Sequence, residues 1–366
     1  MEKQATFMEE ALVEAEKGRG RTGPNPMVGC VVVKKGNIVG RGHHAKAGGL
    51  HAEVAALEDA GRFANGADIY VTLEPCNHFG HTPPCTDALI KAGVNRVFVG
   101  MRDPNEFANG RAIRRLRKAG IGVETGILRN QCIEQNEAFS HFIKTHRPWV
   151  VAKMAQTLDG KVATDSGESK WITGKESRRY GHRLRNELDG ILVGVGTVLA
   201  DNPLLTCRVR GGRDPIRIIL DTQARSPLTA ACWRVGKRNP GTSLIFCSER
   251  APKARTKALN LLAGVQVIAV PEVKGRVALG AVLDELGRRD LTSILVEGGP
   301  TVLGGFFSEN VVDKCYTFIA PMIIGGEGLY PSVRGKAVSS LMEASRFRIG
   351  KVERLGSDTL ICSYSQ

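Results

Sequence analysis

Three potential metal ligands within one stretch, residues 50–85, restrict the fold of this chain more than any other feature. His51 stands at the start of a helical pattern rich in Ala, Val and Leu, and Cys76 and Cys85 follow an apolar strand over residues 69–73. One imidazole and two thiolates are ligands that zinc prefers, and three protein ligands leave a fourth position for water. The stretch therefore predicts a zinc site built from a helix start and the end of a strand.

The carboxylate of Glu53 favours a catalytic zinc site over a structural one. Zinc deaminases carry His-x-Glu followed by Pro-Cys-x-x-Cys, and their Glu is the acid/base and not a ligand. Here the first part is intact, whereas eight residues, 77–84, separate the two cysteines. A closed structural site would need a fourth ligand, which His78 or His81 could supply, but it would leave Glu53 without a role. Ordinary buried thiols and a core histidine are the remaining alternative, and the combined spacing of the motif argues against it.

Length and charge limit the class of protein. At 366 residues the chain exceeds what one hydrophobic core usually supports, so two domains are expected. Charged residues make up 24% and apolar residues 42%, which is typical of a soluble globular protein. The net charge of +14 would suit nucleic acid, an anionic membrane surface or phosphorylated small molecules, and charge alone does not choose among them.

The cysteines and the first residues indicate the compartment. Nine cysteines form no regular framework beyond Cys76 and Cys85, which argues against a disulfide scaffold and favours a reducing environment. The first ten residues lack the apolar core of a secretory signal. No apolar run approaches the roughly 20 residues that a membrane span needs. We expect a cytoplasmic protein that does not enter membranes.

Hydrophobic periodicity predicts an α/β layered domain in the first part of the chain. Its expected elements are a helix over 2–17, a hairpin of 28–33 and 37–40, the strand 69–73, a helix over 86–92, a strand over 94–100, a helix over 112–119, a strand over 121–125 and a helix over about 131–144. Pro148 and the strand that restarts at Trp149 place a domain boundary near residue 146.

The second part of the chain alternates strands and helices, which predicts a mostly parallel sheet covered on both faces. Strands are expected over 149–155, 190–194, 216–220, 243–247, 265–270, 293–296 and 314–320, helices over 175–188, 252–263, 277–289 and 301–310, and a closing hairpin of 352–353 and 359–364.

A glycine-rich turn, residues 297–300, joins one of these strands to a helix. Glycines at such a turn let a phosphate approach free N–H groups at the positive end of the helix dipole, although a tight packing turn would explain them equally well. The Rossmann dinucleotide fingerprint fails, because Leu199 stands where it requires a glycine after Gly194 and Gly196. A dinucleotide, if bound, would need another fold.

Several motifs follow one another in a distinctive order. The front half carries Asn25-Pro-Met-Val-Gly-Cys30, His51-Ala-Glu53, Thr72-Leu-Glu-Pro-Cys76 and Thr82-Pro-Pro-Cys85, and the rear half carries Lys153, Thr157-Leu-Asp-Gly-Lys161, Ser166-Gly-Glu-Ser169, Trp171-Ile-Thr173, Thr197-Val-Leu-Ala-Asp-Asn-Pro203 and Val296-Glu-Gly-Gly-Pro300. Together these motifs resemble the bifunctional deaminase/reductase family of riboflavin biosynthesis. The resemblance covers essentially the whole chain. It implies a cytidine-deaminase-like three-layer domain over residues 1–146 and a dihydrofolate-reductase-like domain over 147–366.

The resemblance also implies a reaction for each domain. Zn²⁺ and Glu53 would deaminate 2,5-diamino-6-ribosylamino-4(3H)-pyrimidinone 5′-phosphate, and NADPH would then reduce the ribosyl side chain to give 5-amino-6-ribitylaminouracil 5′-phosphate. The deaminase substrate would contact Asn25 and His44. NADPH would contact Ala155, Trp171, Thr197, Asp201, Gly299, Pro300, Thr301, Val302, Leu303, Gly304 and Gly305, and the second substrate Lys153, Ser169, Arg185, Leu205, Arg208 and Glu297. A homo-oligomer is expected, without nucleic acid or membrane as partner.

Some positions depart from the family pattern. The family usually has Lys or Arg before Thr-Pro-Pro-Cys, and His81 at that position would make a phosphate contact weaker or dependent on pH. Gly49-Leu50 replaces the usual proline before His51, and the loop 103–110 is irregular. A nucleic-acid deaminase is the competing hypothesis, but it would need stacking aromatics, and aromatic residues make up only 5% of the chain. A nonenzymatic binding protein would not need the intact ligands and base.

Overall fold

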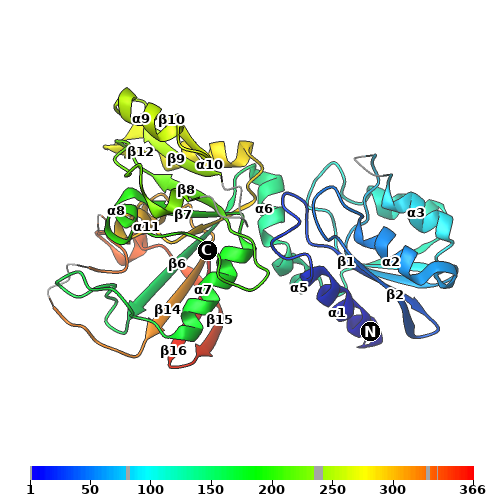
Figure 1. Ribbon diagram of the computed structural model, residues 1–366. Helices are drawn as coiled ribbons and strands as arrows, with labels where there is room; N and C mark the ends of the chain where they lie inside the picture. The colour runs from blue at the N-terminus through cyan, green and yellow to red at the C-terminus, as the bar shows by residue number, and fades with distance from the viewer. Residues whose placement is uncertain (1, 80–82, 235–241, 327–329, 336) are drawn as a thin grey trace. The chain divides into compact units, whose positions relative to one another are not determined.

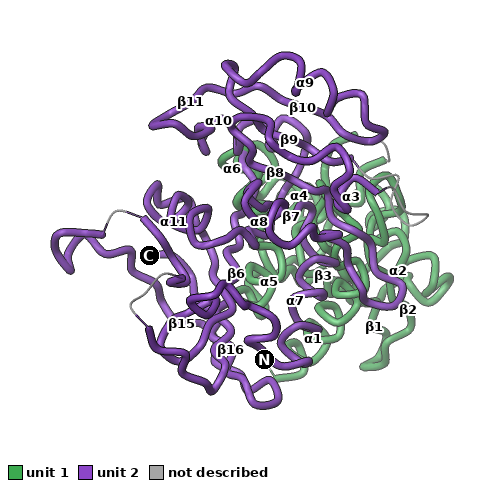
Figure 2. The backbone as a smooth tube through the Cα atoms, turned by 60° about the vertical axis from the view of Figure 1, so that its left-hand side comes forward, with its two compact units in different colours: residues 1–146 green, residues 147–366 purple. Residues whose placement is uncertain are grey.

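The computed structural model describes residues 2–79, 83–234, 242–326, 330–335 and 337–366 (Figure 1). The chain divides into two compact units, Met1–His146 and Arg147–Gln366 (Figure 2). Each unit has its own sheet and its own hydrophobic clusters. No helix among the described residues is long and apolar enough to span a bilayer.

The first unit is a three-layer α/β domain. Its five-stranded sheet has the order β2-β1-β3-β4-β5, with β1 antiparallel to both of its neighbours and β3, β4 and β5 parallel. The elements are α1 (Glu2–Glu16), β1 (Gly29–Lys34), β2 (Asn37–His43), α2 (Ala52–Ala60), β3 (Asp68–Leu73), α3 (Cys85–Ala92), β4 (Arg96–Met101), α4 (Arg111–Lys118), β5 (Gly122–Thr125), α5 (Arg129–Gln135) and α6 (Glu137–Thr145).

Alternation along the strands builds a core on each face of this sheet. Val32, Ile69 and Val97 face one side, where α2, α3 and α4 contribute their small or branched residues. Val31 and Tyr70 face the other side, where α1 and α5 pack. The expected three-layer α/β arrangement of the front half is confirmed.

Close contact between α1 and β1 depends on Gly29. A Cβ atom added there would collide with the backbone of Ala11 and Ala15 in α1. We therefore expect Gly29→Ala to lower the free energy of unfolding by about 3 kcal/mol, at the upper end of overpacking effects. Urea unfolding of the variant measures the loss. The matched control is Gly181→Ala, because a Cβ on Gly181 meets no atom within 4 Å. Equal stability of the two variants would contradict the prediction.

The second unit is built on a nine-stranded sheet of order β10-β9-β8-β7-β13-β6-β14-β16-β15. The first seven strands in this order are parallel, and β16 and β15 add an antiparallel edge. The strands are β6 (Trp149–Thr157), β7 (Gly190–Gly194), β8 (Ile216–Leu220), β9 (Ser243–Ser248), β10 (Val265–Val270), β13 (Ser293–Val296), β14 (Lys314–Ala320), β15 (Phe347–Leu355) and β16 (Asp358–Ser365), with β11 (Glu272–Val273) and β12 (Arg276–Val277) forming a separate ribbon.

Helices cover both faces of the large sheet, as Figure 1 shows. They are α7 (Lys175–Glu187), α8 (Val195–Asp201), α9 (Lys253–Asn260), α10 (Leu279–Arg288) and α11 (Pro300–Ser308). One core packs α10 and α11 on the sheet, and the core on the opposite face packs α8 and α9. The expected mostly parallel, doubly covered sheet is confirmed.

The structure differs from the sequence expectations at several elements, including the unexpected ribbon of β11 and β12. The helix expected over 131–144 is two helices that meet at Asn136, because its buried side chain accepts a hydrogen bond from Met27 N and donates one to Met27 O. Helix α8 was not expected at all. The closing hairpin is longer than expected, since β15 is a polar edge strand whose outer residues are mostly exposed and carry little apolar pattern.

Candidate functional site

The zinc ligands predicted in the first unit lie together. His51 is the N-cap of α2, Cys76 lies in the loop after β3, and Cys85 is the first residue of α3. His51 Nδ1 is 3.2 Å from Cys85 Sγ and 3.4 Å from Cys76 Sγ, and the three ligand atoms lie within 4.8 Å of one another. Tetrahedral zinc, with Zn–S of about 2.3 Å and Zn–N of about 2.0 Å, would separate such atoms by about 3.5 Å. The donor set and its spacing therefore fit zinc.

The thiols of Cys76 and Cys85 have pKa values shifted in opposite directions. The hydrogen bond from Cys85 lowers the pKa of Cys76 to about 4, and the same contact raises the pKa of Cys85. The backbone N–H of Cys85 also donates to Cys76 Sγ at 3.2 Å. Cys76 is thus held as a thiolate by the start of α3, and a bound metal would deprotonate Cys85 as well.

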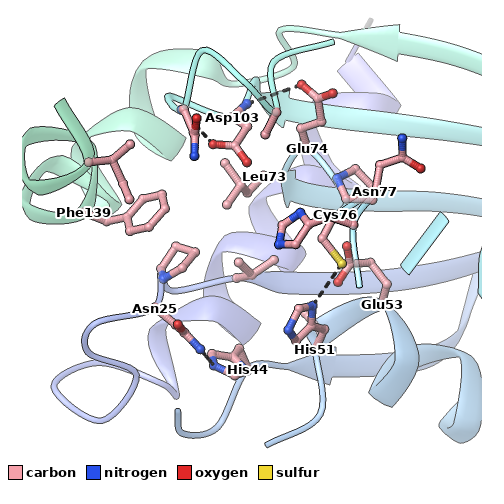
Figure 3. Close-up of a pocket in the computed structure, with 18 of the residues that line it drawn as sticks. Asn25, His44, His51, Glu53, Leu73, Glu74, Cys76, Asn77, Asp103 and Phe139 are labelled. Atoms are coloured by element: carbon pink, nitrogen blue, oxygen red, sulfur yellow. Dashed lines mark hydrogen bonds between the residues drawn. The ribbon is translucent and has the colours of Figure 1, made fainter. Parts of the chain in front are cut away.

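Glu53 is buried beside these ligands, with 3% of its surface exposed. Burial, followed by the negative charge of Cys76, raises the pKa of Glu53 to about 7. Figure 3 shows its carboxylate next to the Cys76 sulfur, which itself faces His51. The carboxylate is therefore placed to exchange protons with a group held between the three ligands.

A cavity of about 560 Å³ opens over this cluster, which is a usual size for a small-molecule site. His44 Nδ1 lies 2.9 Å from the carbonyl oxygen of Leu50, and His44 Nε2 lies 3.1 Å from Asn25 Nδ2. A carbonyl only accepts, so Nδ1 carries the proton and Nε2 accepts from the Asn25 amide. The Asn25 side-chain oxygen is left available to a ligand, and Asn25 and His44 both line the cavity.

The cavity also has walls that the sequence motifs did not single out. Figure 3 places Glu74 and Asp103 across the pocket from Asn25, His44 and His51. Other lining residues are Asn77, His78, Asn105, Phe107, Arg111, Phe139 and Ile143. His78 is outside the cluster of possible ligands found among the described residues, and His81 lies outside the described residues. The Thr-Leu-Glu-Pro-Cys motif already contains Glu74, and the Asp103-Pro-Asn105 turn was the other available signal.

In the second unit, two strand-to-helix turns lie side by side. Strands β7 and β13 are parallel neighbours, and each leads directly into a helix whose N-cap is Gly194 or Gly299. A Cβ on Gly299 would lie 3.8 Å from Thr197 Oγ1, and one on Gly194 would lie 2.7 Å from a methyl group of Val302. The two helix N-termini are therefore adjacent at the carboxyl edge of the sheet, where an anionic group can bind.

Not every residue of the 299–305 run faces that edge. Leu303 is buried in the core, and a Cβ on Gly304 would collide with the carbonyl oxygen of Arg334. Gly305 lies against Leu279. These three positions face the protein interior. Pro300 has no N–H and the N–H of Val302 donates to the carbonyl oxygen of Gly299, so Gly299 and Thr301 are the residues of the run that can present N–H groups to a ligand.

Other predicted residues of the second unit lie on the loops around this edge or in the strands below. Lys170 pairs with Asp201 at 3.5 Å, and the Arg178 guanidinium lies 4.4 Å from the ring centre of Trp171. Ser169 and Arg208 are exposed. Leu205 is buried in the core on the α8 side, and Ala155 packs near Phe318.

An ion pair joins α7 to the end of β13. Arg185 Nε and Nη2 donate to the two carboxylate oxygens of Glu297 at 2.9 and 2.8 Å, and Nη1 donates to the carbonyl oxygen of Thr206. Burial would raise the pKa of Glu297, but the charges of Arg185 and Lys153 outweigh it and hold the pKa at about 2. Three predicted substrate residues, Lys153, Arg185 and Glu297, are thus brought together.

We expect Glu297→Gln to lower the free energy of unfolding by about 2–3 kcal/mol, because the half-buried Arg185 would lose its counter-charge and a charge-assisted hydrogen bond. Since the folded pKa of about 2 lies below the ordinary value of 4.5, the stabilisation is present above pH 4.5 and is lost as the pH falls toward 2. Urea unfolding at pH 7 and at lower pH measures both. Arg288→Ala removes an exposed ion-pair partner and should cost less than about 1 kcal/mol. If the difference in unfolding free energy between wild type and Glu297→Gln were the same at every pH, the charge of Glu297 would not be its cause.

Comparisons with known proteins agree with a deaminase unit followed by a reductase unit. The chain matches the cytidine and deoxycytidylate deaminase zinc-binding region over residues 1–101 and the RibD C-terminal domain over residues 148–361. The riboflavin biosynthesis protein RibD of Aquifex aeolicus (strain VF5) is 45% identical over 359 residues, covering 97% of this chain and 96% of that protein. The RibD of Escherichia coli (strain K12) is 38% identical over 372 residues, covering 97% of each chain.

Solved structures give the same result. Acinetobacter baumannii RibD has a TM-score of 0.87 and 34% identity, covering 100% of this chain and 99% of that one. A diaminohydroxyphosphoribosylaminopyrimidine deaminase/5-amino-6-(5-phosphoribosylamino)uracil reductase from Thermotoga maritima has a TM-score of 0.87 and 37% identity, with the same coverage. A zinc-binding deaminase unit and a reductase unit in one chain, matched over nearly the whole length, show that this protein belongs to the RibD family of riboflavin biosynthesis enzymes.

Proposed function

We propose that the chain catalyses two successive steps of riboflavin biosynthesis. The first unit deaminates 2,5-diamino-6-ribosylamino-4(3H)-pyrimidinone 5′-phosphate, and the second unit reduces the ribosyl side chain of the product with NADPH to give 5-amino-6-ribitylaminouracil 5′-phosphate. The observation that carries the proposal is the buried carboxylate of Glu53 beside three zinc ligands, in a cavity large enough for a pyrimidine. The Thermotoga maritima relative is named for this pair of activities.

His51, Cys76 and Cys85 would hold the metal of the first unit, where zinc supplies a Lewis acid that lowers the pKa of water. Glu53 takes a proton from the attacking water and delivers it to the departing ammonia. Glu53 lines the pocket with only 3% of its surface exposed, so bulk solvent has little direct contact with its carboxylate.

Asn25 and His44 orient the pyrimidine. The proton on His44 Nδ1 is fixed by the carbonyl oxygen of Leu50, so the Asn25 amide must donate to Nε2 and its oxygen faces the pocket as an acceptor. An amino group or ring N–H of the substrate satisfies that acceptor. The pair therefore selects an edge of the ring that carries N–H groups.

In the second unit, NADPH would supply the hydride and would bind at the paired turns through Thr197 and Gly299-Pro300-Thr301-Val302. Trp171, Asp201 and Ala155 would complete its site. The N–H groups of Gly299 and Thr301 would face the cofactor, and Leu303, Gly304 and Gly305 would support the helix that follows. Both carboxylate oxygens of Glu297 already accept from the half-buried Arg185, so Arg208, which is exposed, is the better candidate for the substrate phosphate. Lys153, Ser169 and the backbone of Leu205, whose side chain is buried, would form the rest of the substrate site.

The proposal includes a phosphorylated small-molecule substrate, a homo-oligomeric assembly and a cytoplasmic location, without nucleic acid or membrane as partner. The assembly and location rest on the sequence and the family resemblance. Native mass measurement and cell fractionation test them.

The decisive experiment uses the purified full chain with its zinc content measured. We expect ammonia release from the phosphorylated pyrimidine, none from single-stranded DNA, and NADPH oxidation when the deaminated product is supplied. Ammonia release from single-stranded DNA in preference to the pyrimidine would favour the nucleic-acid hypothesis. Absence of both activities from zinc-loaded protein would overturn the proposal.

A further inference from the structure

The deaminase pocket has three acidic groups and one permanent cation among its described lining residues. Glu53, Glu74 and Asp103 supply the carboxylates. Arg111 is the permanent cation, since these described lining residues include no other lysine or arginine. Its position is the start of α4, directly after the loop 103–110. A substrate that carries a phosphomonoester needs a positive group, and three carboxylates around the same space would otherwise repel it.

Arg111 is available for such a contact. Within the part of the chain that the structure describes, its guanidinium makes no ion pair and no hydrogen bond, and the side chain is exposed. Arg115, one turn later on the same helix, donates to Asn77 at 2.9 Å and pairs with Asp87. Arg117 donates to the carbonyl oxygen of Val123. Arg111 thus differs from these neighbours by having all its donors free.

The backbone that carries Arg111 is held in place by Glu74. This carboxyl group is buried, with 4% exposed, and its Oε2 accepts from the backbone N–H of Asp103 at 3.4 Å and of Gly110 at 3.0 Å. The two ends of the loop 103–110 are therefore closed on one oxygen atom. Gly110 has φ of +73° and the N–H of Arg111 donates to Ala108, so the chain turns sharply into α4. The position of Arg111 at the pocket is fixed although its side chain is free.

We infer that Arg111 binds the 5′-phosphate of the deaminase substrate and sets the preference of this site for a phosphorylated pyrimidine. The inference rests on the proposed deaminase function and assigns one of its contacts. Guanidinium offers a planar fork that matches phosphate oxygens, so the contact is bidentate and charge-assisted. His81, at the position where the family usually has Lys or Arg, lies outside the described residues and has no part in this assignment.

The test compares the phosphorylated substrate with its dephosphorylated form in four proteins: wild type, Arg111→Ala, Arg111→Lys and Arg114→Ala. Arg114 is the matched control, because it is an exposed arginine of the same helix that does not line the pocket. We expect Arg111→Ala to raise KM for the phosphorylated substrate by about 10- to 100-fold, the usual effect of losing a hydrogen bond to a charged group. Its kcat, and its KM for the dephosphorylated substrate, should stay unchanged.

Arg111→Lys should recover part of the loss, and Arg114→Ala should behave as wild type. Equal effects of Arg111→Ala on both substrates, or the same penalty in Arg114→Ala, would overturn the inference. Calorimetric binding of the phosphorylated substrate gives an answer that does not depend on turnover. If wild type binds this substrate without releasing ammonia, the proposed function fails, whereas the affinity difference between wild type and Arg111→Ala still decides the phosphate contact.

Discussion

Replacing Glu53 by glutamine is expected to lower the rate of ammonia release by about 10²- to 10⁴-fold, the range that general acid–base catalysis contributes. The substitution keeps the shape of the buried side chain but removes its ability to accept and return a proton. Zinc should remain bound, because His51, Cys76 and Cys85 are unchanged. Initial rates of ammonia release, with metal analysis on the same sample, measure the two effects separately.

Glu58→Gln is the matched control, since Glu58 is an exposed carboxylate on the same helix, α2. It should leave ammonia release unchanged. The Glu53 variant should still oxidise NADPH when the deaminated product is supplied, because the second unit has its own sheet and core. A Glu53 variant with nearly full deaminase activity would exclude Glu53 as the proton shuttle, and loss of both activities would contradict independent sites.

Cys85→Ala is expected to remove zinc and to reduce ammonia release at least about 10³-fold, because zinc lowers the pKa of water from 15.7 to about 7. The variant leaves one imidazole and one thiolate, which are too few protein ligands for a stable zinc site. Cys85 is fully buried at the first position of α3, so a water molecule does not easily take the place of its sulfur as a zinc ligand in the variant. Metal analysis after dialysis and an ammonia-release assay measure the result.

Cys132→Ala provides the control, since Cys132 is a buried free thiol of the same unit that packs against the other face of the sheet. It should retain zinc and deaminase activity. Exhaustive chelation of wild type should reproduce the effect of Cys85→Ala while NADPH oxidation continues. Full deaminase activity after complete removal of zinc would refute the metal assignment.

The zinc ligands and Glu53 could be predicted from the sequence because their chemistry is local. His51 and Glu53 are two residues apart at a helix start, and each cysteine follows a recognisable strand or precedes a helix. Such spacing predicts where these side chains lie relative to one another without knowledge of any tertiary contact. Strands of the parallel sheets were equally accessible, since buried runs such as Ile191-Leu-Val193 are apolar on both faces.

The remaining walls of the pocket depend on strand order. Asp103, Asn105 and Arg111 follow β4, and they reach the zinc site because β4 lies parallel to β3, so that the carboxyl ends of both strands share one edge. The sequence contains both strands but does not state that they are neighbours. The break at Asn136 has a similar origin, because its partner Met27 is 109 residues away in the chain.

The run 299–305 shows what a resemblance leaves open. It implies one set of cofactor contacts, whereas the structure adds that the Leu303 side chain lies in the core and that a side chain on Gly304 would collide with the backbone of Arg334. A motif marks a segment, whereas packing shows which of its side chains are directed into the core. Only the packed structure supplies the second kind of information.

Each unit draws its hydrophobic clusters from its own residues, and both units belong to one polypeptide. Every round of translation therefore delivers the two catalysts in equal number, whatever the expression level. Mutations that alter the turnover of one half need not disturb the architecture of the other. Selection can then adjust the relative rates of the two steps by amino-acid substitution. A change in gene dosage leaves the ratio of the two units at one to one.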